Sequence, residues 1–255
     1  MPLLYLRRLS GVERTAASNR QLAVVLAFVA GATNAGGYLA VRQYTSHMSG
    51  IVSSMADNTV LGKSELVFAG LGAVVSFLVG ASCSAILINW GRRQRLRSQY
   101  AFPLLLEAGL LLCFGLVGGT LARERGLFVP MTVMLLCFIM GLQNAIITKV
   151  SRAEIRTTHV TGIITDLGIE LGKLVYWNRA PADEAGAAVR ADREKLRLLA
   201  ALLAMFFVGG VCGALGFARG GFGTTIPLAV LLLVLAAVPV LDDVRAWVDR
   251  LFVPR

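Results

Sequence analysis

The two histidines of the chain stand in the same kind of short sequence box, although they lie far apart. His47 belongs to the run TSHMSG at residues 45–50, and His159 belongs to THVTG at residues 158–162. Imidazole titrates near neutral pH, so both side chains are available for a proton-coupled role. One histidine per box, without a carboxylate at a fixed spacing, is weak support for a metal site. We therefore expect no metal and no cofactor.

Each histidine box lies inside a longer stretch that occurs twice, at residues 31–63 and 141–173. Both stretches open with a Gly-x-x-Asn-Ala box at the end of an apolar run, and both close on Gly-Lys. Asn34 and Asn144 are 110 residues apart, and the two histidines are 112 apart. The side-chain amides are suited either to satisfying broken backbone at a helix end or to contacting a solute.

A second pattern, Phe-x-Val-Gly-x-x-Cys-x-Ala, also occurs twice, at residues 77–85 and 206–214. Several boxes that recur in the same order indicate an internal duplication. Gly80 and Gly209, inside this pattern, are expected to let their helices pack closely against neighbours.

Three carboxylates follow the histidine boxes, Asp57 in the first stretch and Asp166 and Glu170 in the second. Ionisable groups are expensive inside a bilayer and by default mark a pathway for ions or solutes. The alternative is that both segments are interfacial amphipathic helices whose charges lie among lipid headgroups. The candidate substrate-binding or pathway residues are Asn34, His47, Ser49, Asp57, Asn144, His159, Thr161, Asp166 and Glu170.

Three further charged residues, Arg42, Glu107 and Arg156, are secondary candidates. Glu107 lies well inside a strong apolar run, so we expect it to face other helices and to accept a hydrogen bond from a basic loop residue. Its counterpart region, residues 231–232, is apolar, so its role would be asymmetric. The arginines are candidate anion contacts, with ordinary loop charges as the stronger alternative. No catalytic motif is present, so no catalytic residue is predicted.

The composition is typical of a membrane protein. Hydrophobic residues make up 56% of the chain and charged residues 16%, and the mean hydropathy is +0.70. Apolar runs of about 20 residues match the length that a helix needs to cross about 30 Å of hydrocarbon. The net charge of +10 is explained by Lys and Arg in cytoplasmic loops, and no basic stretch is interleaved with exposed aromatics as a nucleic-acid surface requires. The sequence predicts an all-α polytopic membrane protein that binds no nucleic acid.

Six apolar runs are expected to span the membrane, at residues 22–39, 66–90, 102–121, 128–148, 198–217 and 226–241. The segments 48–61 and 160–177 are short or interrupted by charge, so we expect them to be polar, non-spanning or half-spanning helical inserts. The hydroxyls of Thr45 or Ser46, and of Thr157 or Thr158, are expected to cap the starts of these inserts.

Charge counting supports this topology. With six spans, 20 of the Lys and Arg residues fall on one side and 5 on the other, whereas eight spans give 16 and 9. The larger bias favours six spans with both termini in the cytoplasm. Three spans per half is an odd number, so the halves face opposite ways, as in the inverted repeats of many transporters. The predicted parts are a tail at 1–20, repeat 1 at 21–122, repeat 2 at 127–241 with a charged linker at 178–197, and a tail at 242–255.

With these motifs the chain resembles the YoaK family, small bacterial membrane proteins that share a domain of unknown function. The resemblance covers about residues 20–241 and is carried by GATNAGG at 31–37, TSHMSG at 45–50, Asp57, GLQNA at 141–145 and THVTG at 158–162. It implies an integral, permease-like protein of the bacterial inner membrane. It implies no particular substrate and no catalytic residues.

The function favoured by these features is a small-solute transporter or channel, with a polar site formed by the two inserts. Its partners would be a small ion or polar solute and the lipid bilayer, with a homodimer as a further possibility. Two alternatives stay open. One is an intramembrane enzyme that acts on a lipid-like substrate, and the other is a membrane scaffold that transports nothing.

Overall fold

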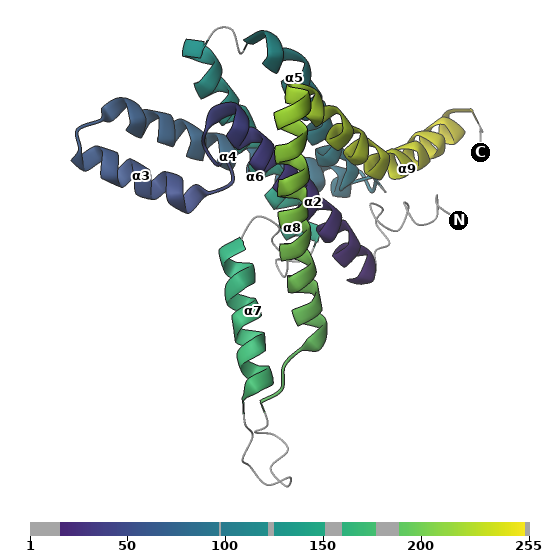
Figure 1. Cartoon of the computed structure of the whole chain (residues 1–255). Coiled ribbons are helices and arrows are strands. Elements are labelled where there is room, and N and C mark those ends of the chain that lie inside the picture. Colours follow the sequence, from purple (N-terminus) through teal and green to yellow (C-terminus); the bar gives the residue numbers. More distant parts are fainter. Residues whose placement is uncertain (1–15, 97, 122–124, 151–159, 177–188, 253–255) are drawn as a thin grey trace.

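The computed structural model describes residues 16–96, 98–121, 125–150, 160–176 and 189–252. These residues form helices joined by short connections and include no strand, which confirms the all-α class (Figure 1). The helices are α2 (Ala16–Val41), α3 (Met48–Val60), α4 (Ser64–Arg93), α5 (Ala101–Leu121), α6 (Arg125–Val150), α7 (Val160–Val175), α8 (Arg193–Gly220), the 3-10 helix η1 (Gly221–Thr224) and α9 (Thr225–Phe252).

Within the described residues, four stretches are long and apolar enough to cross a membrane, which supports the prediction of a membrane protein. They are Ala17–Val41, Ser64–Arg93, Val129–Lys149 and Arg193–Arg245, and the last of them runs through both α8 and α9. The shorter stretch Ala101–Leu116 of α5 is also apolar. Since α3 and α7 do not belong to this set, the two segments expected as inserts stand apart from the long apolar helices.

The long helices pair across the two halves of the sequence. The most extensive packing joins α2 to α8, α4 to α6 and α5 to α9, so each of these helices has its main partner in the other half. The first two pairs run parallel and the third runs antiparallel. The contacts that fix these directions are Arg20–Glu194 and Gly36–Phe217 for α2 and α8, Gly72–Met134 and Asn89–Lys149 for α4 and α6, and Ser98–Asp243 and Gly115–Thr225 for α5 and α9.

Glycines make the two parallel crossings possible. A Cβ at any of four positions would meet the backbone carbonyl of a phenylalanine on the partner helix: Gly31 and Phe206, Gly209 and Phe28, Gly80 and Phe138, Gly141 and Phe77. Only a residue without a side chain lets the two backbones approach this closely. The close packing expected at Gly80 and Gly209 is thereby confirmed, and both crossings use residues at equivalent positions of the duplication.

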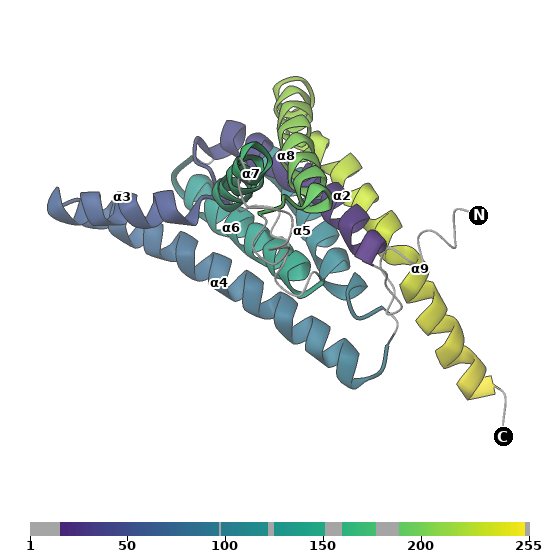
Figure 2. The same ribbon diagram turned by 90° about the horizontal axis from the view of Figure 1, so that it is seen from below.

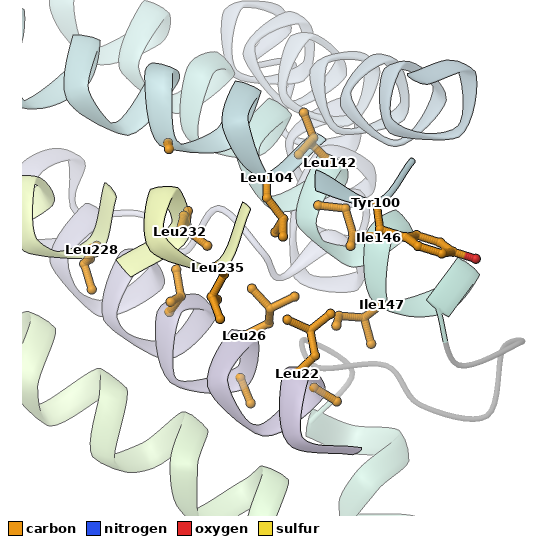
Figure 3. Close-up of a cluster of buried hydrophobic side chains, with 14 of the residues drawn as sticks. Leu22, Leu26, Tyr100, Leu104, Leu142, Ile146, Ile147, Leu228, Leu232 and Leu235 are labelled. Carbon is orange, nitrogen blue, oxygen red and sulfur yellow. The ribbon is translucent and has the colours of Figure 1, made fainter. Parts of the chain in front are cut away.

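The buried apolar residues form two clusters. The larger one includes Leu22 of α2, Leu104 of α5, Ile146 of α6 and Leu235 of α9. Figure 3 shows part of it, with Leu104 among side chains from α6 and α9. The smaller cluster gathers residues of α2, α3, α4, α5, α6 and α8, among them Val41, Ala73, Phe114, Val133 and Phe217.

The shorter helices α3 and α7 lie at the edges of this bundle. α3 packs against α4, and α7 packs against α8. Figures 1 and 2 show α3 and the adjoining start of α4 extending away from the other helices, and Figure 1 shows the α7–α8 hairpin leaving in a different direction. Neither short helix packs extensively against the other.

Candidate functional site

A carboxyl group lies inside the bundle, on α5. Glu107 is 0% exposed and so is Gln143 of α6. The amide Nε2 of Gln143 donates a hydrogen bond of 2.9 Å to Oε1 of Glu107. At 1.5 Å per residue Glu107 lies about 9 Å along α5 from Ala101, well beyond the helix end.

The start of α5 is fixed by the far end of α9, which helps to hold Glu107 in place. Oδ2 of Asp243 accepts hydrogen bonds from the backbone N–H of Ser98 at 2.8 Å and from the Ser98 hydroxyl at 2.6 Å. The Ser98 carbonyl in turn accepts the first bond of the helix, from the N–H of Ala101. A carboxylate at this position satisfies backbone donors that a helix start leaves open.

The pair formed by Glu107 and Gln143 is only half satisfied. Oε2 of Glu107 and Oε1 of Gln143 are buried and have no hydrogen-bond partner in the described part of the chain. The same holds for the side-chain oxygens of Thr33, Ser84 and Asn144. Buried polar atoms without partners are rare, and each one needs an explanation such as a bound water, ion or ligand.

The expectation for Glu107 is met in its first part only. The side chain faces neighbouring helices, as the sequence predicted, but its hydrogen-bond donor is the Gln143 amide and not a basic loop residue. Gln143 was not among the candidates. It immediately precedes Asn144 in the duplicated box, and nothing in the sequence shows that α5 and α6 bring it to Glu107.

The polar pair has no equivalent in the other half of the duplication. With the offset of 110 residues that joins the Asn-Ala boxes, Gln143 corresponds to Thr33. With the offset between Pro103 and Pro227, Glu107 corresponds to Leu231. Thr33 is buried and its hydroxyl has no partner within the described residues. Both members of the polar pair therefore differ between the halves, in line with the apolar counterpart that the sequence predicted for Glu107.

Asn34 has a structural contact that explains its place in the first box. Its Oδ1 accepts hydrogen bonds from the hydroxyl of Ser46 at 2.9 Å and from the backbone N–H of Ser46 at 3.4 Å. This tether joins the end of α2 to the turn that precedes α3. The predicted cap by Thr45 or Ser46 is wrong, because the residue at the start of α3 is His47 and no side chain caps the helix; the Ser46 hydroxyl is used by Asn34 instead.

The other candidates of the first insert lie on its surface. His47, Ser49 and Asp57 are exposed, and so is Arg42. The His47 ring lies directly over Gly50, where a Cβ would collide with it. The glycine that follows the histidine in the box is thus needed for the ring to fold back on the first turn of α3.

The acids of the second insert hold α7 against the start of α8. Glu170 is 2% exposed; its Oε1 accepts from Lys173 Nζ at 2.9 Å and its Oε2 from the backbone N–H of Asp192 at 2.8 Å. Asp166 forms an ion pair of 3.6 Å with Lys195. The hydrogen bonds from Lys173 and from Asp192 hold the pKa of Glu170 below its ordinary value. Both acids are therefore engaged in a polar seam between two helices.

Asp192, which the sequence did not single out, begins α8. Its side chain accepts hydrogen bonds from the backbone N–H groups of Lys195 and Glu194, and these bonds lower its pKa. An Asp at this position followed by a helical run is a common start signal, and it could have been read from the sequence.

The remaining candidates do not meet at one point. Thr161 is exposed, and its carbonyl accepts a bond from the Thr165 hydroxyl. Asn144 is 8% exposed and lies next to Gln143 on α6. His159 and Arg156, like Thr157 and Thr158, lie outside the described residues, so a site shared by His47 and His159 stays a prediction. Within the described residues, no three His, Cys, Asp or Glu side chains form a group that could hold a metal ion.

Comparisons with known proteins give a family and little more. A family model described as a protein of unknown function, DUF1275, matches residues 22–238. No curated protein and no solved structure matches the chain.

Proposed function

Since the chain belongs to the DUF1275 family of proteins of unknown function, we propose from its own geometry that it is a small-solute transporter or channel of the bacterial inner membrane. Glu107 and Gln143 form its central polar site, and the six helices α2, α4, α5, α6, α8 and α9 span the membrane as two inverted three-helix repeats. The exchange of helices between the halves supports the repeat, because equivalent glycines make both crossings.

One observation carries the proposal: a fully buried carboxyl with an oxygen that has no partner in the described residues, inside a bundle of apolar helices. A charged acid at the centre of a membrane helix costs on the order of 3 kcal/mol. Even a buried ion pair can often be replaced by well-packed apolar side chains without a loss of stability, and a lone acid has no charged partner to offset its burial. A buried acid in a membrane bundle is therefore a functional group by default, and solute or ion passage is the function that most often requires one.

The direction of α5 and α9 supports six spans over eight. Spanning helices alternate in direction along the chain. If α3 and α7 do not span, α5 is the third span and α9 the sixth, so the two run in opposite directions; if both spanned, α5 and α9 would be the fourth and eighth and would run the same way. The contacts Ser98–Asp243 and Gly115–Thr225 make them antiparallel.

The positions of the charged ends support cytoplasmic termini. Three contacts join helix ends: Arg20–Glu194, Lys149–Asn89 and Ser98–Asp243. The same helix ends adjoin the basic segments of the chain. Placing these ends in the cytoplasm follows the positive-inside rule. α7 then leaves the bundle on the cytoplasmic side and α3 on the opposite side.

Transport is tested with the full chain reconstituted into proteoliposomes. Osmotic shrinkage and swelling are followed by light scattering after jumps in NaCl, KCl, NH4Cl, glycerol or urea, with protein-free liposomes as the blank. The double variant Glu107→Leu/Gln143→Thr, which copies the residues of the other half, is the matched control. We expect at least one solute to cross faster with the native chain than with this variant. Equal rates for every solute in native, variant and protein-free vesicles would rule out transport through this site.

The exposed surface of α3 favours a second candidate, a scaffold that binds a partner through its inserts. In that case the exposed positions Val52 and Val60 would face water. Single cysteines placed there in a chain without its native cysteines are labelled with a membrane-impermeant maleimide. Uniform labelling from one side supports the scaffold. Positions along α3 that are labelled only after detergent is added support an insert in contact with lipid.

A further inference from the structure

The chemistry of the polar pair defines which ligands it can accept. Both atoms that lack a partner, Oε2 of Glu107 and Oε1 of Gln143, are oxygens. An amide oxygen only accepts hydrogen bonds, and an ionised carboxylate does the same. The two groups are joined by a hydrogen bond of 2.9 Å from Nε2 of Gln143 to Oε1 of Glu107, so both unpartnered oxygens belong to one buried polar pair. A ligand that completes this pair must bring positive charge or hydrogen-bond donors.

No basic side chain supplies that charge from within the described chain. The ion pairs there join Arg20 to Glu194, Lys173 to Glu170 and Lys195 to Asp166. The basic residue of α6 nearest in sequence to Gln143 is Lys149, and it bonds to Asn89 at 3.4 Å near the helix end. Among the described residues Glu107 thus has no positive partner, and a buried charge of this kind is unfavourable unless a proton or another cation neutralises it.

We propose that Glu107 and Gln143 hold a monovalent cation, an alkali ion or an ammonium group, with Oε2 of Glu107 and Oε1 of Gln143 as its protein ligands. This inference rests on the proposed function and names the class of ion that its site takes. One carboxylate balances one positive charge. A divalent metal would need further acids or histidines, and no such group of three exists among the described residues. An anion would be repelled.

The duplication makes this a single site. The equivalent positions in the other half carry Thr33 and Leu231, which offer one hydroxyl and no charge. We therefore expect one cation per chain and not a symmetric pair of sites.

Binding is tested by the thermal unfolding of the full chain in detergent, with NaCl, KCl or NH4Cl compared with N-methyl-D-glucamine chloride at equal ionic strength. A cation at about ten times its Kd is expected to raise the unfolding temperature by about 3–5 °C. Glu107→Gln is expected to abolish the shift while it unfolds no earlier than the native chain in N-methyl-D-glucamine. The matched control Glu65→Gln removes an exposed acid from the first turn of α4 and is expected to keep the shift.

A second measurement, chemical modification of Glu107, uses the native chain and so does not depend on the folding of a variant. Dicyclohexylcarbodiimide is an apolar reagent that modifies protonated carboxyls, and the modified residue is identified by mass spectrometry. The bound cation is expected to slow the modification of Glu107 at least threefold. Modification at the same rate in every salt, together with unchanged unfolding temperatures, would show that a proton alone neutralises Glu107 and would overturn the cation site.

The two proposals fail separately. A cation shift in detergent without any flux in proteoliposomes leaves the cation site standing and removes transport. Flux of glycerol or urea through the native chain, without a cation shift, leaves transport standing and removes the cation site.

Discussion

The two helix crossings of this protein are alike in backbone and different in chemistry. The α2–α8 and α4–α6 pairs approach through equivalent glycines, and each glycine faces the carbonyl of an equivalent phenylalanine. Beside them, α5 and α6 bring Glu107 to Gln143, while the equivalent positions of the other half carry Leu231 and Thr33. Duplicated residues thus build the scaffold, and the candidate chemistry lies where the two halves diverge.

The largest expected effect breaks what the halves share. Gly31→Ala and Gly141→Ala each place a Cβ against a backbone carbonyl that cannot move without shifting its helix. Each change is expected to destabilise the folded protein by about 2–3 kcal/mol, seen as an earlier thermal unfolding in detergent. Gly109→Ala is the control, because a Cβ there meets nothing within 4 Å. Clearly unequal losses at Gly31 and Gly141 would contradict the equivalence of the two crossings.

The next effect tests what the halves do not share. Gln143→Leu leaves the buried Glu107 carboxyl without its donor and is expected to cost about 1–3 kcal/mol. Adding Glu107→Leu removes the remaining polar group, so the double variant should recover that loss, measured by the same unfolding assay in N-methyl-D-glucamine. A double variant that is less stable than Gln143→Leu alone would mean that Glu107 has a structural role.

A smaller effect compares the two asparagines of the duplicated box. Asn34→Ala removes the bonds to Ser46 that tether the turn before α3, and a loss of about 1 kcal/mol is expected. Hydrogen exchange of residues 48–60 should speed up in this variant. Asn144→Ala is expected to leave exchange in that segment unchanged. If both variants loosen α3 equally, the tether is not local.

The smallest effect separates the inserts by pH. The pKa values of Glu170 and Asp192 are lowered in the folded state, from ordinary values of 4.5 and 3.8. A lowered carboxyl pKa stabilises the fold above the ordinary value and loses this contribution as pH falls through the lowered one. Exchange in α7 should therefore speed up as pH is reduced below about 4.5, after correction for intrinsic exchange rates, and α3 should show no comparable change. Glu170→Gln is expected to reduce the pH dependence of α7 to the part that Asp192 contributes.

Hydropathy and charge predicted the helical segments well. Every expected span and insert is a helix whose start lies within about six residues of the predicted one. The largest difference at an end is at α9, which continues to Phe252, because the polar stretch that begins at Asp242 prolongs the helix and lets Asp243 reach Ser98. Composition marks where a membrane helix becomes polar and not where it stops.

The arrangement of those helices was beyond the sequence. The duplication shows which segments are alike, but likeness does not say which segments touch. For this reason Glu107 was found as an isolated acid, while its partner Gln143 was missed. Asp166 and Glu170 were expected to mark a pathway because acids in apolar runs are costly. In the structure their cost is offset by Lys195, by Lys173 and by a backbone N–H. Of these partners, only Lys173 lies at helical spacing from one of the acids in the sequence.

The exchange of helices between the halves has a consequence for biogenesis. Arg20 of α2 pairs with Glu194 of α8, 174 residues later. In the proposed topology, at the usual rates of synthesis, α2 enters the bilayer roughly 10–35 s before its main partner exists, and α4 likewise precedes α6. The N-terminal half must therefore wait in the membrane with its glycine faces open to lipid, where an insertase or chaperone can reach them, and assembly is complete only after α9 has been made.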